Sequence, residues 1–268
     1  FKNNYHLLPP TIYSILWKKQ SISNILKLIL YKLGFLLMII SYIKWFLIAL
    51  TTIILAILAT IVSLISPKFA TLTLVKIWGK LILLISFVKL EVRGLENIKD
   101  KPIIIMYNHK SFYDIFSFAA FMNIDWRAMM KKELLKIPFF GQAVKVMGHY
   151  FVARDGSFAD RREVIKILKK IKNGKAIFIA PEGTRNPDKK LLEFKDGGFF
   201  ISAKTRVNII PMIIKGADDI VKKNSLKINP GTISINILPE IEVEDFLSSD
   251  QPVSRLKDHV YSIFNNNI

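Results

Sequence analysis

Long runs of apolar residues fill the first third of the chain. The run at 45–66 carries no charge over 22 residues, and as a helix it would measure about 33 Å, enough to cross the hydrocarbon core of a bilayer. Pro67 would end that helix. Shorter apolar stretches stand on either side, at 33–43 and 71–89. The pattern predicts a membrane-embedded helical module over residues 1–90.

Lysines on both sides of the central apolar run indicate how this module lies in a membrane. They are Lys18, Lys19, Lys27 and Lys32 before the run, and Lys68, Lys76 and Lys80 after it. Because lysine favours the cytoplasmic side of a membrane, lysine on both flanks argues against exporting either flank. A helical pair that enters and leaves one leaflet keeps every lysine on one face. We favour this monotopic arrangement, and a single transmembrane helix is the alternative.

The remainder of the chain, residues 91–268, alternates short β-rich runs with helical patterns. Strands are predicted at 101–107, 149–154, 175–180, 207–216 and 232–241, and helices at 111–122, 157–173, 196–206 and 253–264. This alternation predicts an α/β domain whose central sheet is covered by helices. In such sheets, functional residues gather where strands end.

The charge and composition narrow the class of partner. The chain has a formal net charge of +18 and 51% hydrophobic residues, and residues 1–90 contain ten lysines, no arginine and no acidic residue. Lysines beside apolar runs suit an anionic lipid surface, whereas a nucleic-acid site more often brings arginine and an exposed basic helix. We therefore expect membrane lipids as partners and no nucleic acid.

The absence of cysteine limits the possible chemistry. It excludes disulfides, zinc–thiolate sites and a cysteine nucleophile. The four histidines follow no metal-ligand spacing, so we expect no metal site.

The first candidate site follows the predicted strand at 101–107. In MYNHKSFYDIF, residues 106–116, His109 and Asp114 stand five positions apart. Five residues on a regular helix put two side chains roughly 140° apart. The two can therefore meet only if His109 precedes the helix and Asp114 lies one turn inside it. Such a pair indicates a site, and a surface or capping histidine is the simpler alternative.

Four blocks of sequence resemble those of the glycerolipid acyltransferases, the family that includes the bacterial 1-acylglycerol-3-phosphate acyltransferases. NHKSFYD resembles the family's H-x4-D motif. The other three blocks are KKELLKIPFFGQAVKVMGHYFVARD (131–155), APEGTRN (180–186) and VNIIPMIIKG (207–216). The likeness runs from about residue 90 to 240. It implies a mixed central β-sheet flanked by helices, and no cofactor beyond an acyl thioester co-substrate, either acyl-CoA or acyl-carrier protein.

The resemblance gives His109 and Asp114 catalytic roles. A positioned imidazole removes a proton from an attacking alcohol near neutral pH, and a carboxylate holds its tautomer and supports the imidazolium that forms. The implied reaction moves a fatty acyl group to the sn-2 hydroxyl of 1-acyl-sn-glycerol 3-phosphate and makes phosphatidate. Ser111 offers an acyl-serine route, although a helix-capping role suits it better.

The third block is the expected site for the acceptor's phosphate. Glycine lets backbone N–H groups approach an anion, and arginine grips phosphate bidentately. The resemblance implies that Glu182 and Arg185 bind the phosphoglycerol head, with Gly183 and Thr184 shaping the turn. An ordinary solvated turn is the alternative.

Two basic residues of the second block are further candidates for phosphate binding. Arg154 matches a basic position, but Ala153 stands where the family usually has an aspartate, so a partner for Arg154 is in doubt. Lys131 is the other candidate, and plain surface charge is its alternative. The aromatic pair in PFFG, residues 138–141, lines an acyl path or packs in the core. His149, on a predicted strand, is expected to be structural.

Two alternatives to the implied reaction remain at this stage. The first changes the acceptor to glycerol 3-phosphate, a lysophospholipid or a lyso-aminolipid. The second is a non-catalytic membrane lipid-binding protein, for which a base would have no use. The expected location is a bacterial inner membrane, with the catalytic domain on the cytoplasmic face.

Overall fold

The computed structural model describes residues 10–153, 158–171, 175–186, 190–222 and 225–268. Its strands are β1 (Val88–Arg93), β2 (Ile103–Tyr107), β3 (Trp126–Lys131), β4 (Tyr150–Val152), β5 (Ala176–Ile179), β6 (Ile209–Lys215) and β7 (Gly231–Ile237). Its helices are α1 (Pro10–Ser63), α2 (Pro67–Phe69), α3 (Lys76–Ser86), α4 (Tyr113–Phe121), α5 (Phe140–Val146), α6 (Phe158–Lys170), α7 (Asp196–Thr205), α8 (Ala217–Ile220), α9 (Glu244–Leu247) and α10 (Pro252–Asn267). A π-helical segment, η2 (Ala70–Val75), and two 3-10 segments, η3 (Leu95–Asn97) and η4 (Lys132–Lys136), complete these elements.

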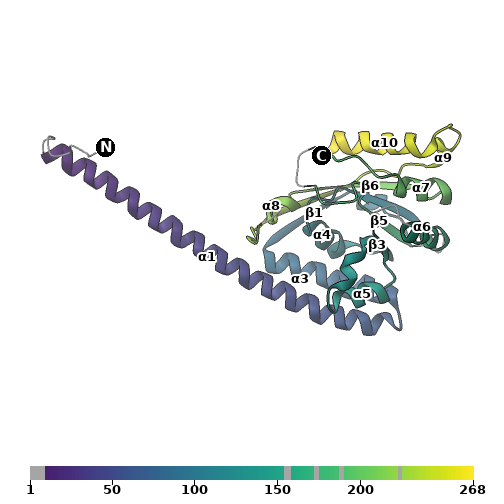
Figure 1. Ribbon diagram of the computed structural model, residues 1–268, viewed down its shortest axis with the longest axis horizontal. Helices are drawn as coiled ribbons and strands as arrows, with labels where there is room; N and C mark the ends of the chain where they lie inside the picture. The colour runs from purple at the N-terminus through teal and green to yellow at the C-terminus, as the bar shows by residue number, and fades with distance from the viewer. Residues whose placement is uncertain (1–9, 154–157, 172–174, 187–189, 223–224) are drawn as a thin grey trace.

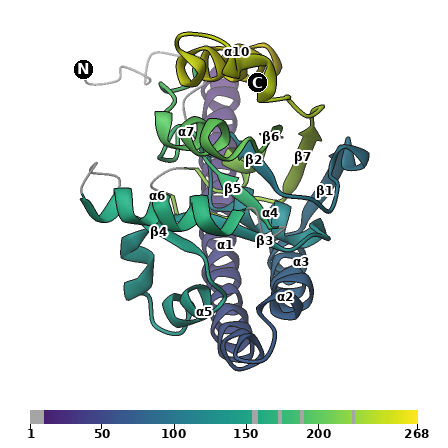
Figure 2. The ribbon, with the colours of Figure 1, turned by 90° about the vertical axis from the view of Figure 1, so that its right-hand side faces the viewer.

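The strands form one seven-stranded sheet in the order β1-β7-β6-β2-β5-β3-β4. Neighbouring strands are parallel except β6 and β7, which are antiparallel. The predicted α/β fold with a mixed sheet is therefore confirmed. Figure 2 shows β1 and β7 at one end of the sheet, and β4 beside α6 at the other.

Strand β2 shows why the sheet's central strands are apolar without alternation. All five of its residues are buried. Ile103 and Ile105 pack in the same cluster as α3 and α4, whereas Ile104 and Met106 pack in the cluster of α7 and α10. Both faces are covered by helices, as Figure 1 shows, so residues on both sides of the strand leave water.

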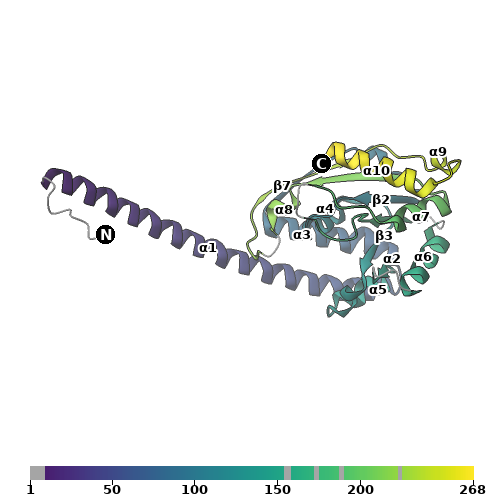
Figure 3. The same cartoon turned by 45° about the horizontal axis from the view of Figure 1, so that its top comes forward.

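The apolar N-terminal segment forms a long helix and a returning one. The run at 33–43 and most of the run at 45–66 form one continuous helix, α1, of 54 residues, which ends at Ser63. Ser66 caps the segment that follows, and α3 then runs back beside α1 (Figure 1). Within the described residues, two helical stretches, Ile29–Ser63 and Pro67–Ser86, are long and apolar enough to cross a membrane. The N-terminal part of α1 extends away from the domain (Figure 3).

Lys44, which interrupts the apolar runs, is buried and joins the two helices. Its ammonium group donates to the Ser86 carbonyl at 3.3 Å and lies 5.1 Å from the centre of the Phe87 ring. A cation at the last carbonyls of a helix satisfies an acceptor that has no partner within the helix. The lysine therefore stabilises the end of α3.

The helical segment packs directly on the α/β domain. A Cβ atom on Gly79 of α3 would lie only 2.6 Å from the Phe116 carbonyl oxygen on α4, so glycine permits this close approach. Beside it, the Trp78 and Phe116 rings meet edge to face with centroids 5.0 Å apart. Strand β1 begins at Val88, so the sheet starts inside the segment assigned from sequence to the helical module.

Two strands were not predicted from the sequence, and each has a physical reason. Strand β1 lies at the edge of the sheet and exposes alternate residues. Strand β3 contains Arg127, which reads as a surface residue but is only 1% exposed. Its guanidinium donates to the Asp125 carboxylate at 2.5 Å and to the Thr71 hydroxyl at 3.2 Å. These contacts compensate the charge inside the protein.

Candidate active site

Asn108 fixes the position where the chain leaves β2. Its side-chain NH₂ donates to the Ile214 carbonyl at 2.7 Å, and its side-chain oxygen accepts from the Ile214 N–H at 2.7 Å. The Asn108 side chain thus makes two hydrogen bonds to the β6 backbone beyond the last paired residue of β2, in place of backbone-to-backbone bonds. Because this group is buried and fully paired, the next residue, His109, is held at the end of the sheet.

His109 and Asp114 meet in the strand-to-helix turn. The His109 Nδ1 lies 2.8 Å from Asp114 Oδ2, and that same oxygen accepts from the backbone N–H groups of Lys110 at 2.7 Å and Ser111 at 2.8 Å. Asp114 is fully buried in the first turn of α4. This contact selects, for the neutral ring, the tautomer with its proton on Nδ1 and a free electron pair on Nε2, which is the tautomer that a general base needs.

Ser111 is placed for a local role. Its side chain is buried, and its hydroxyl accepts from the Tyr113 N–H at 3.4 Å. It does not line the cavity described next, so the geometry favours the capping role over the acyl-serine route.

His109 lines a cavity of about 710 Å³. Apolar side chains form most of its wall, and they come from the N-terminal helices as well as from the sheet. Contributors include Leu55 and Ala56 of α1, Trp78 of α3, Phe116 of α4 and Phe140 of α5. The cavity, which we call the acyl cavity, therefore lies between the α/β domain and the helical segment that was expected to anchor it.

The third block reaches the same cavity through its backbone turn. Gly183 has φ of +71°, a left-handed conformation that favours glycine. The Asn186 N–H donates to the His109 carbonyl at 2.7 Å, which ties this loop to the first block. Thr184 and Arg185 line the acyl cavity together with His109, and the Arg185 guanidinium carbon lies 3.8 Å from the centre of the Phe112 ring. Arg185 is thus aligned by an aromatic ring at the mouth of the cavity.

Glu182 occupies a different place from the one expected. It is only 3% exposed, and one carboxylate oxygen accepts from the Asn186 side chain at 2.9 Å and from the Leu192 N–H at 3.0 Å. This oxygen is used inside the protein, and Glu182 is not among the residues that line the acyl cavity. Its contacts hold the turn in shape rather than reach a ligand.

Comparisons with known proteins agree with this geometry. The Acyltransferase family model matches residues 89–215. A chloroplast 1-acyl-sn-glycerol-3-phosphate acyltransferase of Brassica napus is 33% identical over 169 residues, 60% of this chain and 47% of that one. The corresponding protein of Saccharomyces cerevisiae is 31% identical over 189 residues, 64% of this chain and 61% of that one.

A solved structure extends the likeness over most of the fold. The crystal structure of PlsC, the 1-acyl-sn-glycerophosphate acyltransferase from Thermotoga maritima, superposes with a TM-score of 0.72 at 25% identity, and the match covers 85% of this chain and 92% of that one. Residues 89–215 therefore carry an Acyltransferase domain, and the fold is that of PlsC. The chain spans roughly half to three-fifths of the length of the curated relatives named above.

The remaining candidate residues do not all lie at the acyl cavity. Lys131 is exposed, lines the acyl cavity and lies 3.8 Å from the Glu133 carboxylate. Arg154 lies outside the described residues. Of the PFFG segment, Phe140 lines the cavity, whereas Phe139 is 47% exposed with φ of +61°.

His149 is a neutral structural residue. It is buried, and its Nδ1 accepts from the Ala128 N–H at 2.9 Å. Burial, together with the nearby charges of Arg127 and Lys175, lowers its pKa from 6.5 to about 3. The described part of the chain contains no cluster of three or more histidine or acidic residues that could hold a metal ion.

The sequence analysis did not identify the cavity residues supplied by α1 and α3. Leu55, Ala56 and Trp78 lie in a segment whose composition indicated only a membrane. No motif marks them, because an apolar side chain facing lipid and one facing an acyl pocket are chemically the same.

Proposed function

We propose that this chain is a membrane-associated acyltransferase that moves a fatty acyl group from an acyl thioester to the sn-2 hydroxyl of 1-acyl-sn-glycerol 3-phosphate, producing phosphatidate. The observation that carries the proposal is the His109–Asp114 pair at an apolar cavity that Arg185 also lines. The relatives, which are named 1-acyl-sn-glycerol-3-phosphate acyltransferases, support the same reaction. The thioester, of acyl-CoA or acyl-carrier protein, is a co-substrate, and the reaction needs no cofactor.

The proposed chemistry uses the free Nε2 of His109. That nitrogen takes the hydroxyl proton as the acceptor oxygen attacks the thioester carbonyl carbon. A C–O bond forms, the C–S bond breaks, and the proton passes from Nε2 to the leaving thiolate. Asp114 stabilises the transient imidazolium through Nδ1–H, and the products are an ester and a free thiol.

The acceptor is oriented by its two ends in this proposal. Its phosphate pairs with Arg185, which the Phe112 ring aligns, and Lys131 adds a second positive charge at the cavity. Its acyl chain occupies the apolar cavity, which excludes water from the reacting thioester.

The packing of α1 supports the monotopic arrangement. Ile48, Ala56 and Ala59 are buried against the domain, whereas Phe46, Ile61 and Ile65 on the same segment are 66%, 57% and 89% exposed. A helix with one side against protein and exposed apolar residues elsewhere suits insertion into one leaflet better than passage through both. We place the domain on the cytoplasmic face of a bacterial inner membrane, the side that lysine-flanked segments favour.

The test uses the purified chain in detergent with one acyl thioester and a panel of lysolipids. We expect mass spectrometry to show phosphatidate as the main product. His109→Ala should lower turnover by two to four orders of magnitude, roughly the contribution of a positioned base, while lysophosphatidate binding is retained. His259→Ala is the matched control, because His259 is an exposed histidine on α10.

Two results would contradict the proposal. Undiminished acyl transfer by His109→Ala would remove the base from the mechanism. A strong preference for an acceptor without phosphate would remove the role of Arg185.

A further inference from the structure

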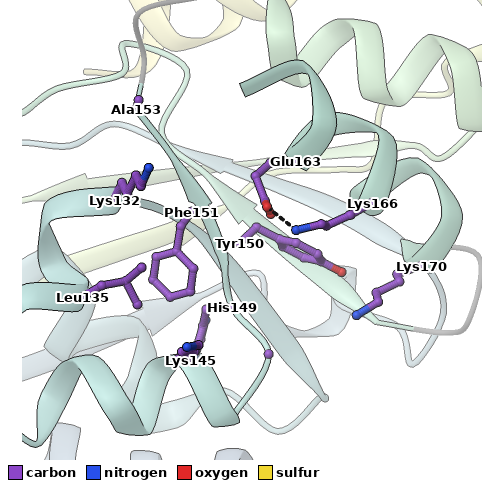
Figure 4. Close-up of a pocket in the computed structure, with 11 residues that line it drawn as sticks. Lys132, Leu135, Lys145, His149, Tyr150, Phe151, Ala153, Glu163, Lys166 and Lys170 are labelled. Carbon is purple, nitrogen blue, oxygen red and sulfur yellow. Dashed lines mark hydrogen bonds and ion pairs between the residues drawn. The ribbon is translucent and has the colours of Figure 1, made fainter. Parts of the chain in front are cut away.

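A second pocket, of about 370 Å³, lies at the edge of the sheet that β4 forms. It follows β4, the last strand in the sheet order, between η4 and α5 on one side and α6 on the other. Figure 4 shows Lys132 and Lys145 on one side of this strand and Lys166 and Lys170 on the other. We call it the lysine pocket.

The charges of the lysine pocket are poorly balanced. The four lysines are exposed, and the one acidic side chain in the lining, Glu163, pairs with Lys166. Within the described part of the chain, Lys132, Lys145 and Lys170 have no ion-pair partner. Like charges around a hollow repel one another unless an anion enters, so the pocket is suited to an anionic group.

The floor of this pocket is the edge of a sheet. No described strand lies beyond β4. Tyr150 and Val152 are only 4% and 6% exposed and Phe151 is half-buried, so an extended partner would meet this edge from inside the pocket rather than across open surface. Backbone groups at a strand edge bind extended chains that carry amides, as in peptide recognition by strand addition. The ligand that fits both features is an extended amide chain that ends in a phosphate.

The lysine pocket adjoins the acyl cavity. His149 and Ala153 line both of them. Ala153 directly follows β4, at the end of the strand that points toward the site, whereas Lys145 and Lys170 flank the start of the strand (Figure 4). From Tyr150 to Ala153 the strand advances by about 10 Å, at roughly 3.3 Å per residue. An extended ligand along β4 would therefore have its phosphate at one end and its other terminus at the acyl cavity.

We propose that the lysine pocket binds the 4′-phosphopantetheine arm of the acyl donor, with its phosphate near Lys145 and Lys170 and its thioester end passing Ala153 into the acyl cavity. This inference rests on the proposed function. The arm has two amides in an extended chain, a terminal phosphate and a terminal sulfur, and acyl-CoA and acyl-carrier protein both carry it. Arg185 and Lys131 remain for the acceptor's phosphate, so the two anionic groups have separate sites.

The test compares two thioesters that differ only in the phosphate, acyl-4′-phosphopantetheine and acyl-pantetheine. The wild-type chain should prefer the phosphorylated donor. Lys145→Ala/Lys170→Ala should reduce that preference, measured as the ratio of the two kcat/KM values, by about tenfold. The control Lys99→Ala/Lys204→Ala removes the same charge from two exposed lysines outside the pocket and should leave the ratio unchanged.

Direct binding separates this proposal from the proposed function. 4′-Phosphopantetheine itself, titrated into the wild-type chain in a neutral detergent, should bind, and the double variant should weaken the binding by a similar factor. This measurement needs no turnover, so it tests binding at the lysine pocket even if the wild-type chain acylates no lysolipid.

Several outcomes would overturn the assignment. One is a ratio unchanged in the double variant, and another is binding by the variant as tight as by the wild type. In a third, only acyl-CoA or only acyl-carrier protein loses kcat/KM in the variant. The lysines would then recognise the nucleotide or the carrier's acidic surface rather than the shared arm.

Discussion

The substitution Asp114→Asn tests how much of the proposed catalysis depends on a buried negative charge. The amide differs from the carboxylate by little more than that charge, and the surroundings decide how it sits. The Lys110 and Ser111 N–H groups both point at the position of Oδ2, so the amide oxygen must occupy it. The amide NH₂ then takes the place of Oδ1, which has no hydrogen-bond partner among the described residues. His109 keeps an acceptor for Nδ1–H and therefore keeps its tautomer.

The expected loss is then the electrostatic contribution alone. With Nδ1 and Oδ2 at 2.8 Å, the two charge centres are about 4 Å apart, worth about 4 kcal/mol at an effective dielectric constant of about 20. This corresponds to about three powers of ten in rate. Because the neutral amide still accepts a hydrogen bond, part of the stabilisation remains. We expect kcat to fall by a factor of about 100 to 1,000, less than the roughly 10⁴ seen where such a substitution reverses the tautomer.

The assay is single-turnover acyl transfer with saturating lysophosphatidate, run beside thermal unfolding. Asp100→Asn, at an exposed aspartate before β2, is the matched control. A loss below threefold in a folded protein would refute the role of the Asp114 charge. A loss of about 10⁴ or more would refute the inference that the backbone N–H groups preserve the tautomer.

Three further predictions follow from the same geometry. Arg185→Gln should raise KM for lysophosphatidate about tenfold and leave KM for a phosphate-free lysolipid nearly constant; equal effects on both acceptors would contradict phosphate binding. Leu55→Trp should narrow the acyl cavity, so kcat/KM for the lysophosphatidate with the longest acyl chain should fall about tenfold relative to one about two carbons shorter. An unchanged dependence on acceptor chain length would place the acceptor's acyl chain elsewhere. His149 has a pKa of about 3 in the folded state against 6.5 in the unfolded state. The unfolded state therefore binds a proton that the folded state does not, and the free energy of unfolding decreases as the pH falls below 6.5. The decrease is about 3 kcal/mol at pH 4.5. His149→Asn, which keeps an acceptor near Ala128 and does not titrate, should flatten this pH dependence in denaturant unfolding, and an equal slope in both proteins would contradict the assignment.

The sequence was sufficient to predict the position of a site residue where that position depends on residues nearby in the chain. The five-residue spacing of His109 and Asp114 fixed their relation to the end of β2 and the start of α4, because helix geometry allows few ways for them to meet. Both Arg185 and His109 follow predicted strands, where functional residues were expected, and the structure shows that these strands, β2 and β5, are parallel neighbours.

Glu182 shows the limit of this reasoning. A glutamate in a polar turn reads as solvent-exposed or ligand-binding, yet its carboxylate is buried by Asn186 and by Leu192, ten residues further along. Strand β3 was missed for a related reason, since the cost of burying Arg127 is offset by Asp125 and by Thr71 from a distant segment.

The sequence by itself determined the class of fold, the apolar N-terminal segment and the pairing of His109 with Asp114, because each is encoded in periodicity or in a short spacing. Only the tertiary structure decided that α1 and α3 form part of the wall of the acyl cavity, and that β4 is an edge strand flanked by lysines. Both features join residues far apart in the chain. An apolar or basic side chain is the same in sequence whichever surface it meets, so its role is set by the packing that surrounds it.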